Sequence, residues 1–179
     1  MWSCDKALKR LLIATLLLSA AGPLSGCIQP MYGPASLGST GGSPLATELQ
    51  AIEVDEIPDR IGHYVRNELI FGLNGTGSQP TPRYRLKVKL EEQVQTPIVN
   101  TLTGFSTSAT VIVNAKYSLV SLPDNVEVAN GVAQAIASYD RFTQRFTNVR
   151  AARDAEIRDA KVIADSIRTR IAADLAARR

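Results

Sequence analysis

Apolar and polar residues alternate along three stretches of the chain, 83–94, 107–122 and 126–139. A period of two is that of a β-strand with one face in a core. Residues 123–125, Pro-Asp-Asn, separate the last two stretches and predict an antiparallel hairpin. The first stretch places apolar and basic side chains on opposite faces, with Tyr84, Leu86, Val88 and Leu90 on one and Arg83, Arg85, Lys87 and Lys89 on the other.

Other stretches have the spacing of three and four residues that marks an amphipathic helix. One helix is expected after Pro58, with Asp59 as its N-cap. A second is expected over 148–177, and its last turns should overhang the sheet and fray. A first strand is expected over 48–57. The apolar stripe of the second helix comprises Ile157, Ala160, Ala164, Ile167, Ile171 and Leu175.

The expected elements follow one another in the order β-α-β-β-β-α. This order predicts an α+β fold, a two-layer sandwich in which two helices pack on one face of a mostly antiparallel four-stranded sheet. No internal repeat is visible.

The N-terminus has the organisation of a secretory signal peptide. Three basic residues among the first ten precede an apolar run over 11–21, which is shorter than the ~20 residues that span a membrane. The run ends in Leu24-Ser25-Gly26-Cys27, which resembles the lipobox of bacterial lipoproteins. We therefore expect a signal peptide over 1–26 and a Cys27 that carries covalent N-acyl and S-diacylglycerol lipid.

A lipid on Cys27 would anchor the chain to a membrane that it does not span. Ile28 follows the cysteine in place of the aspartate that retains many lipoproteins at the inner membrane, so we expect the outer membrane. Residues 27–47 combine prolines, glycines and small polar residues without a hydrophobic period and predict a flexible tether. The folded domain is then expected over 48–179.

Removal of 1–26 changes the charge and cysteine counts. The whole chain has a formal charge of +3 and a pI near 9.0, but the remainder has 17 basic and 16 acidic residues, which argues against a nucleic-acid partner. The only other cysteine, Cys4, leaves with the signal peptide, so no thiol remains for a disulfide, a metal or catalysis.

The residues do not predict an enzyme. The single histidine, His63, lies on an expected helix, and Glu91 and Glu92 should point to opposite faces of a strand. No phosphate-binding glycine loop, zinc spacing or nucleophile motif is present, so we expect no metal and no cofactor beyond the lipid on Cys27.

A row of basic residues on one expected strand could bind a ligand. The row Arg83, Arg85, Lys87 and Lys89 would span ~20 Å of one strand face and could contact phosphates. The alternative is a solvated face or a charged edge strand. Tyr139, Phe142 and Phe146, between the last strand and the last helix, could anchor a partner, although packing of that junction is the simpler interpretation.

Short motifs in order along the chain resemble the LptE family of lipopolysaccharide-assembly lipoproteins. They cover nearly all of the chain after the lipobox, although the Gly-Phe that commonly follows the lipidated cysteine is absent. The motifs are Pro30-Met31-Tyr32-Gly33, Arg66-Asn67-Glu68-Leu69, Tyr84-Arg85-Leu86-Lys87-Val88, Tyr117-Ser118-Leu119, Ala137-Ser138-Tyr139, Asp154-Ala155-Glu156 and Ile163-Ala164-Asp165-Ser166-Ile167.

The resemblance implies a non-enzymatic outer-membrane protein that acts as a plug in an LptD-type β-barrel and assists barrel assembly and lipopolysaccharide insertion. It would face the periplasm or lie within the barrel lumen. Arg83, Arg85, Lys87 and Lys89 then become candidate lipopolysaccharide contacts. The alternative is an accessory lipoprotein of another lipid-transfer or barrel-assembly machine, which would show a deep apolar cavity or a different partner. A secreted enzyme is a more distant alternative.

Overall fold

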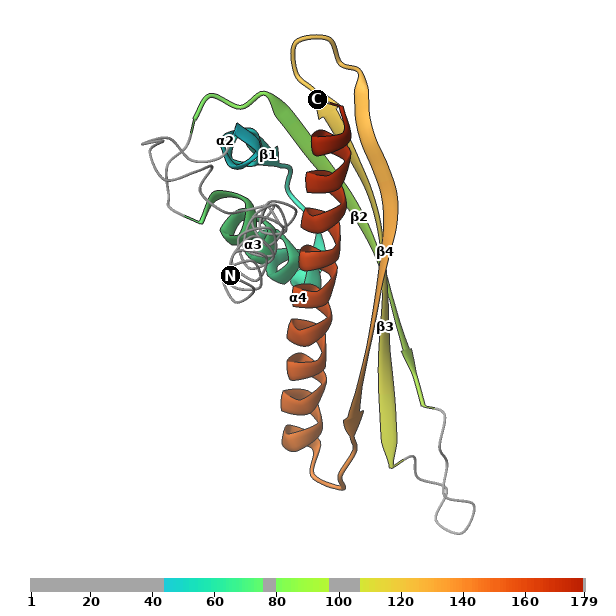
Figure 1. Ribbon diagram of the computed structural model, residues 1–179. Coiled ribbons are helices and arrows are strands. Elements are labelled where there is room, and N and C mark those ends of the chain that lie inside the picture. Colours follow the sequence, from blue (N-terminus) through green and yellow to red (C-terminus); the bar gives the residue numbers. More distant parts are fainter. Residues whose placement is uncertain (1–43, 76–79, 97–106, 179) are drawn as a thin grey trace, which may run out of the picture. The chain divides into compact units, whose positions relative to one another are not determined.

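The computed structural model describes residues 44–75, 80–96 and 107–178 (Figure 1). The expected signal peptide, Cys27 and residues 27–43 of the expected tether lie outside these residues.

The sheet contains four strands in the spatial order β1-β2-β3-β4. β1 (Ile52–Val54) pairs in parallel with β2 (Tyr84–Gln95), whereas β3 (Ser108–Ser121) is antiparallel to both β2 and β4 (Glu127–Asp140). The predicted β3–β4 hairpin and the mostly antiparallel sheet are therefore confirmed. The register of the hairpin shifts next to the turn, because Leu119 pairs with Ala129 but Val120 pairs with Glu127.

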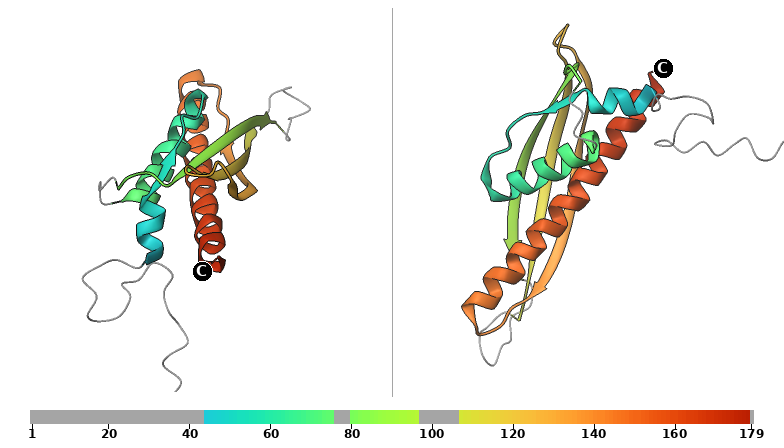
Figure 2. Two further views of the ribbon diagram at one scale, coloured as in Figure 1. Left: turned by 90° about the horizontal axis from the view of Figure 1, so that it is seen from above. Right: turned by 90° about the vertical axis from the view of Figure 1, so that its left-hand side faces the viewer.

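Two helices cover the same face of the sheet, as predicted (Figures 1 and 2). The 33 residues of α4 (Arg145–Ala177) run along β3 and β4, and α3 (Asp59–Asn74) packs against α4 and β1. Alternate residues of each long strand enter the core between sheet and helices. The most completely buried large side chains are Ile57, Val65, Leu69, Leu86, Val111, Val113, Leu119, Ile163, Ile167 and Ile171.

The beginning of the domain differs from the prediction. Residues 44–50 form a helix, α2 (Pro44–Gln50), so the expected strand over 48–57 is reduced to the three residues of β1. Leu45 and Leu49 are one helical turn apart, and both are buried. Pro58, and not Asp59, is the N-cap of α3, and Asp59 begins the helix with a φ of 70°.

The buried face of α4 also differs from the predicted stripe. Ile157 is 43% exposed, whereas Glu156 and Asp159 are almost completely buried. The last turns of α4 pack against the sheet instead of overhanging it, because Leu175 is buried and the Arg178 guanidinium donates to the carbonyl oxygen of Val128.

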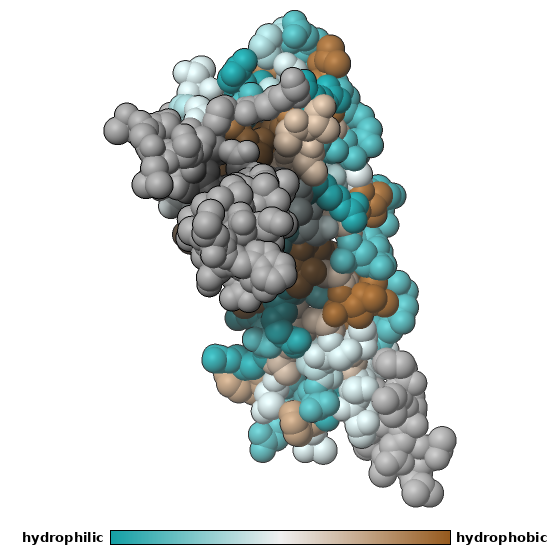
Figure 3. Space-filling model, in the orientation of Figure 1, coloured by the Kyte–Doolittle hydropathy of each residue, from teal (hydrophilic) through white to brown (hydrophobic). Residues whose placement is uncertain are grey.

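On the face that carries α4, exposed apolar side chains are scattered among hydrophilic ones wherever described residues are visible (Figure 3). Within the described ranges, no helix is long and apolar enough to cross a membrane.

Candidate functional site

Three of the four predicted basic residues share the sheet face opposite the helices. Arg85, Lys87 and Lys89 alternate on β2 with the buried Leu86 and Val88, as the period of two predicts. The fourth residue, Arg83, precedes the strand: its amide donates to the carbonyl oxygen of Ala51, and its own carbonyl accepts from the amide of Leu122. The predicted row is therefore a row of three, preceded by one exposed residue.

Arg85 is the least available of the three. Its Nη2 lies 3.3 Å from Oε2 of Glu53, and its Nε lies 3.4 Å from Oδ1 of Asp55. Both acids belong to β1 or directly follow it, so these ion pairs help to hold the short parallel strand against β2. We assign Arg85 mainly to this contact between strands.

Lys87 and Lys89 are exposed, and β3 adds a third lysine beside them. Lys116 is the direct cross-strand partner of Lys89. Its Nζ lies 3.4 Å from Oε1 of Glu91, and both side chains are largely exposed. Solvent screens such a pair, which leaves Lys116 available to a phosphate. The structure thus gathers Lys87, Lys89 and Lys116 into one basic surface, which we call the sheet surface.

A second basic surface lies where β4 turns into α4, at the junction for which packing is the simpler interpretation of the sequence. Phe142 is 57% exposed and Phe146 is 73% exposed, so neither packs the junction. The Arg150 guanidinium carbon lies 5.8 Å from the ring centre of Phe146, a cation–π distance. We call this surface the basic–aromatic turn; it comprises the exposed residues Arg141, Phe142, Arg145, Phe146, Arg150 and Arg153.

The basic–aromatic turn is held in one conformation. The Phe142 amide donates to Oδ1 of Asn148 at 2.7 Å, and Nδ2 of Asn148 donates to the Phe142 carbonyl at 2.7 Å. One asparagine thus satisfies both backbone groups of Phe142 and holds the backbone from which the exposed ring projects. The repeated Arg-Phe pairs at 141–142 and 145–146 were the signal for this surface in the sequence.

Acidic side chains gather around Arg60 at the contact between α3 and α4. Arg60 Nε donates to Oε2 of Glu156 at 2.8 Å, and Nη2 donates to the other oxygen of the same carboxylate. This hydrogen bond and the charge of Glu156 raise the pKa of Arg60. Partial burial raises the pKa of Glu92 on β2, and the charge of Glu156 raises it further.

Asp159 lies one helical turn beyond Glu156 and is 2% exposed. Burial raises the pKa of Asp159 to about 6, against the opposing effects of Arg158 and of a backbone hydrogen bond from Ala137. Its Oδ2 has no hydrogen-bond partner. In the part of the chain that the structure describes, no three metal-ligating side chains are arranged to hold an ion. The cluster joins α3, α4 and the sheet through titratable groups.

Of the remaining candidates, His63 and Glu92 lie apart from both basic surfaces, whereas Glu91 lies beside the sheet surface. His63 is exposed on α3. Glu91 and Glu92 point to opposite faces of β2, because Glu91 meets Lys116 on the sheet surface and Glu92 lies near Arg60 on the helix side.

No family model matches the sequence, and no curated protein is similar to it in sequence. The fold is similar to that of solved bacterial lipoproteins. A candidate lipoprotein from Caulobacter crescentus CB15 is 23% identical, with a TM-score of 0.62 over 75% of this chain and 97% of that chain.

A minor lipoprotein from Acinetobacter baumannii is 12% identical, with a TM-score of 0.51 over 69% of this chain and 91% of that chain. The rare lipoprotein B from Shewanella oneidensis is less similar in fold: it is 14% identical over 66% of this chain and 92% of that chain, with a TM-score of 0.46. The described domain therefore has the fold seen in the first two of these lipoproteins.

Proposed function

We propose that this chain is a lipid-anchored accessory protein of lipopolysaccharide assembly at the outer membrane, of the LptE type and without enzymatic activity. The observation that carries the proposal is the α+β sandwich, similar to the Caulobacter protein over 97% of that chain, behind a sequence that ends its signal peptide in a lipobox. The partner is an LptD-type β-barrel, which the domain enters as a plug.

The lining of a cavity in the described domain favours the function of a plug and not that of a lipid carrier. One cavity, between β1 and α3, has a volume of about 470 Å³ and polar side chains on its wall, among them Gln50, Arg66 and Asn74. A protein that carries a lipid within its fold needs a deep apolar cavity. Such a cavity is the expectation for the alternative function, an accessory lipoprotein of a lipid-transfer machine.

The partner is tested by a detergent pull-down of the full chain through a C-terminal tag, with bound proteins identified by mass. We expect a very large outer-membrane β-barrel protein among them. If the barrel is absent and components of another envelope machine are present instead, the alternative accessory function replaces this one.

The anchor is tested by metabolic labelling with palmitate. A Cys27→Ser variant should lose the label and leave the membrane fraction, because a diacylglyceryl group forms only on a thiol. Cys4→Ser, which lies in the expected signal peptide, is the matched control and should keep both. Label on Cys27→Ser would contradict the proposed anchor.

The lipopolysaccharide contact is assigned to the sheet surface. Lys87→Glu/Lys89→Glu is a better test than reversal of Arg85, which would place three acids together at β1. The matched control is Arg145→Glu/Arg150→Glu in the basic–aromatic turn, with the same change in net charge. We expect the first variant to bind purified lipopolysaccharide more weakly and with less salt dependence. If only the second weakens binding, the contact belongs to the basic–aromatic turn.

A further inference from the structure

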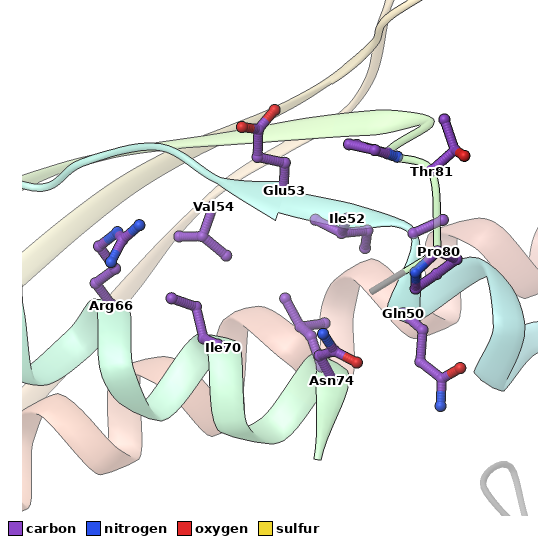
Figure 4. A pocket seen from close by; sticks show the side chains of 12 residues that line it. Gln50, Ile52, Glu53, Val54, Arg66, Ile70, Asn74, Pro80 and Thr81 are labelled. Carbon is purple, nitrogen blue, oxygen red and sulfur yellow. The ribbon is translucent and has the colours of Figure 1, made fainter. Parts of the chain in front are cut away.

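The cavity of about 470 Å³ opens between β1 and α3, close to the end of α2 (Figure 4). From α3, Arg66, Ile70 and Asn74 point toward β1 at intervals of one helical turn, while the side chain of Glu53 points away. Ile52 and Val54 of β1 and Leu73 of α3 supply apolar wall. The volume is within the ~300–1,000 Å³ typical of ligand sites.

One side of β1 is an open strand edge. The backbone of Ala51 and Asp55 bonds toward β2: the Ala51 carbonyl accepts from the amides of Arg83 and Tyr84, and the Asp55 amide donates to the Leu86 carbonyl. Backbone groups alternate between the two edges of a strand. Those of Ile52 and Val54 therefore face away from β2, and no described residue bonds to them on that side.

Two buried polar atoms on the α3 wall have no hydrogen-bond partner. They are Nε of Arg66, a donor, and Oδ1 of Asn74, an acceptor. Buried groups of this kind are uncommon, because each unmade bond costs roughly 1–3 kcal/mol. Both atoms are closed to water, so a ligand would reach them after a rotation of each side chain.

This pair of atoms and the open edge of β1 together discriminate between ligand classes. An inorganic anion offers acceptors to Arg66 but no donor to Asn74. A lipid headgroup can offer donors as well, but it does not repeat donors and acceptors at the spacing of a strand edge. A peptide offers both, a carbonyl and an N–H. The two residues are eight positions apart on the helix, which is ~12 Å along its axis and equals three or four residues of extended chain at ~3.3 Å each.

We propose that the groove between β1 and α3 binds an extended segment of another protein, which adds to β1 as a fifth strand. The segment is about four residues long and has small apolar side chains at alternate positions, which pack on Ile70 and Leu73. Its backbone pairs with Ile52 and Val54 and meets the unpaired groups of Arg66 and Asn74. Strand addition at an open edge is an established mode of peptide recognition. The groove lies apart from the sheet surface, so its occupancy is independent of any lipopolysaccharide contact.

The probe is a fluorescent, end-blocked pentapeptide of alternating valine and threonine, titrated against the full chain in detergent by anisotropy. We expect a dissociation constant on the order of 1 mM or below. The same peptide with N-methyl groups on the backbone nitrogens that would pair with β1 should bind at least tenfold more weakly. Equal binding of the two peptides, or no binding of either, would overturn the proposal.

Two variants locate the site. Ile70→Lys fills the groove and should weaken binding at least tenfold, whereas Phe71→Lys, the next residue on the same helix and 73% exposed, should bind like the parent. Asn74→Leu removes the unpaired acceptor with little change in volume, so it should fold at least as well as the parent while binding several-fold more weakly. Unchanged affinity in Ile70→Lys and Asn74→Leu would place the peptide elsewhere. Self-association of the parent that Ile70→Lys abolishes would assign the groove to a second copy of the chain and would also overturn the proposal.

Discussion

The ring of Tyr117 lies across Gly131, its cross-strand partner in the β3–β4 hairpin. A Cβ atom at position 131 would lie 2.7 Å from the Tyr117 hydroxyl oxygen and 2.9 Å from Cζ. The ring has little room to move, because Tyr117 is only 4% exposed. Burial raises the pKa of the Tyr117 hydroxyl, and the charge of Asp174 on α4 raises it further. Because position 131 has no side chain, the Tyr117 ring from β3 can lie over β4, close to Asp174 of α4.

Gly131→Ala should destabilise the domain by about 1–3 kcal/mol, the usual cost of overpacking a core. The free energy of unfolding, measured by urea denaturation, checks this. Gly72→Ala is the matched control: its Cβ would meet the movable Arg168 side chain at 3.2 Å, and alanine is the better helix former, so we expect little change or a gain. In a Tyr117→Leu background the cost of Gly131→Ala should largely disappear. An equal cost in both backgrounds would show that the contact with the ring is not its cause.

Arg60 and Glu156 form an ion pair, and loss of the arginine should destabilise the domain more than loss of the glutamate charge. The Arg60 side chain is 57% exposed and the Glu156 side chain 5% exposed. Arg60→Ala leaves a buried carboxylate without its partner, for which we expect a loss of about 3 kcal/mol. Glu156→Gln leaves a guanidinium that can turn to water, so its loss should be about 1 kcal/mol. Thermal unfolding of both variants at pH 7 provides the comparison, and equal losses would contradict this account.

The three long strands could be predicted closely because burial on one face imposes a strict period of two. In β2, Leu86 and Val88 are buried and Lys87 and Lys89 are exposed, as the pattern requires. The α2 helix was missed because seven residues make barely two turns, and only the pair Leu45 and Leu49 reports its buried side. Its position beside glycine- and proline-rich sequence favoured a tether.

The α4 pattern misled for a different reason. A hydrophobic stripe places Ile157 in the core and gives no reason to bury Glu156 or Asp159. The buried Glu156 carboxylate is bonded by Arg60, which is 96 residues away along the chain. Asp159 has a backbone hydrogen bond with Ala137 of β4. Neither contact is visible in the sequence pattern. The basic row on β2 was also predicted only in part. The period of two predicts which sheet face carries Arg85. It does not predict the ion pairs of Arg85 with β1, or that Lys116 of β3 lies beside Lys89.

The buried carboxyl of Asp159 should make stability depend on pH. Its pKa is about 6 in the folded chain against an ordinary 3.8, so the folded state binds the proton more tightly. The contribution of Asp159 is therefore most favourable below pH ~4, declines as the pH rises toward 6 and is constant above that, with a total of about 3 kcal/mol.

Asp159→Asn removes this charge and keeps an acceptor for the Ala137 backbone. The variant should be more stable than the parent at pH 7, by up to about 3 kcal/mol, and should match the parent near pH 4. Urea denaturation at pH 4, 5, 6 and 7 gives both curves. Asp165→Asn, on the exposed side of α4, should change stability by less than about 0.5 kcal/mol at every pH. Parallel curves for Asp159→Asn and the parent would refute the assignment.

Two arginines of α4, and Arg178 directly after it, bond to backbone carbonyls along the outer edge of β4. Arg158 donates to the carbonyl oxygen of Ser138 at 3.1 Å, Arg170 to that of Val132 at 2.5 Å, and Arg178 to that of Val128. The spacing of the arginines matches the spacing of the carbonyls. From Arg158 to Arg170 the helix rises ~18 Å, and from Ser138 to Val132 the strand rises ~20 Å. The next interval is ~12 Å between Arg170 and Arg178 and ~13 Å between Val132 and Val128. The helix and its C-cap residue can therefore bond at three places along a long edge strand.

Replacement of all three arginines by glutamine should expose that edge to pairing with a second copy of the chain. An open edge strand is a template for association, and β4 has 14 residues. We expect the sedimentation coefficient of the triple variant in detergent to rise with protein concentration, while that of the parent stays constant. The control is Arg141→Gln/Arg145→Gln/Arg150→Gln, which removes the same charge from the basic–aromatic turn and leaves the edge bonded. Association of the first variant alone would show that the hydrogen bonds to β4 prevent pairing of this edge. Equal association of both variants would show instead that loss of charge is the cause.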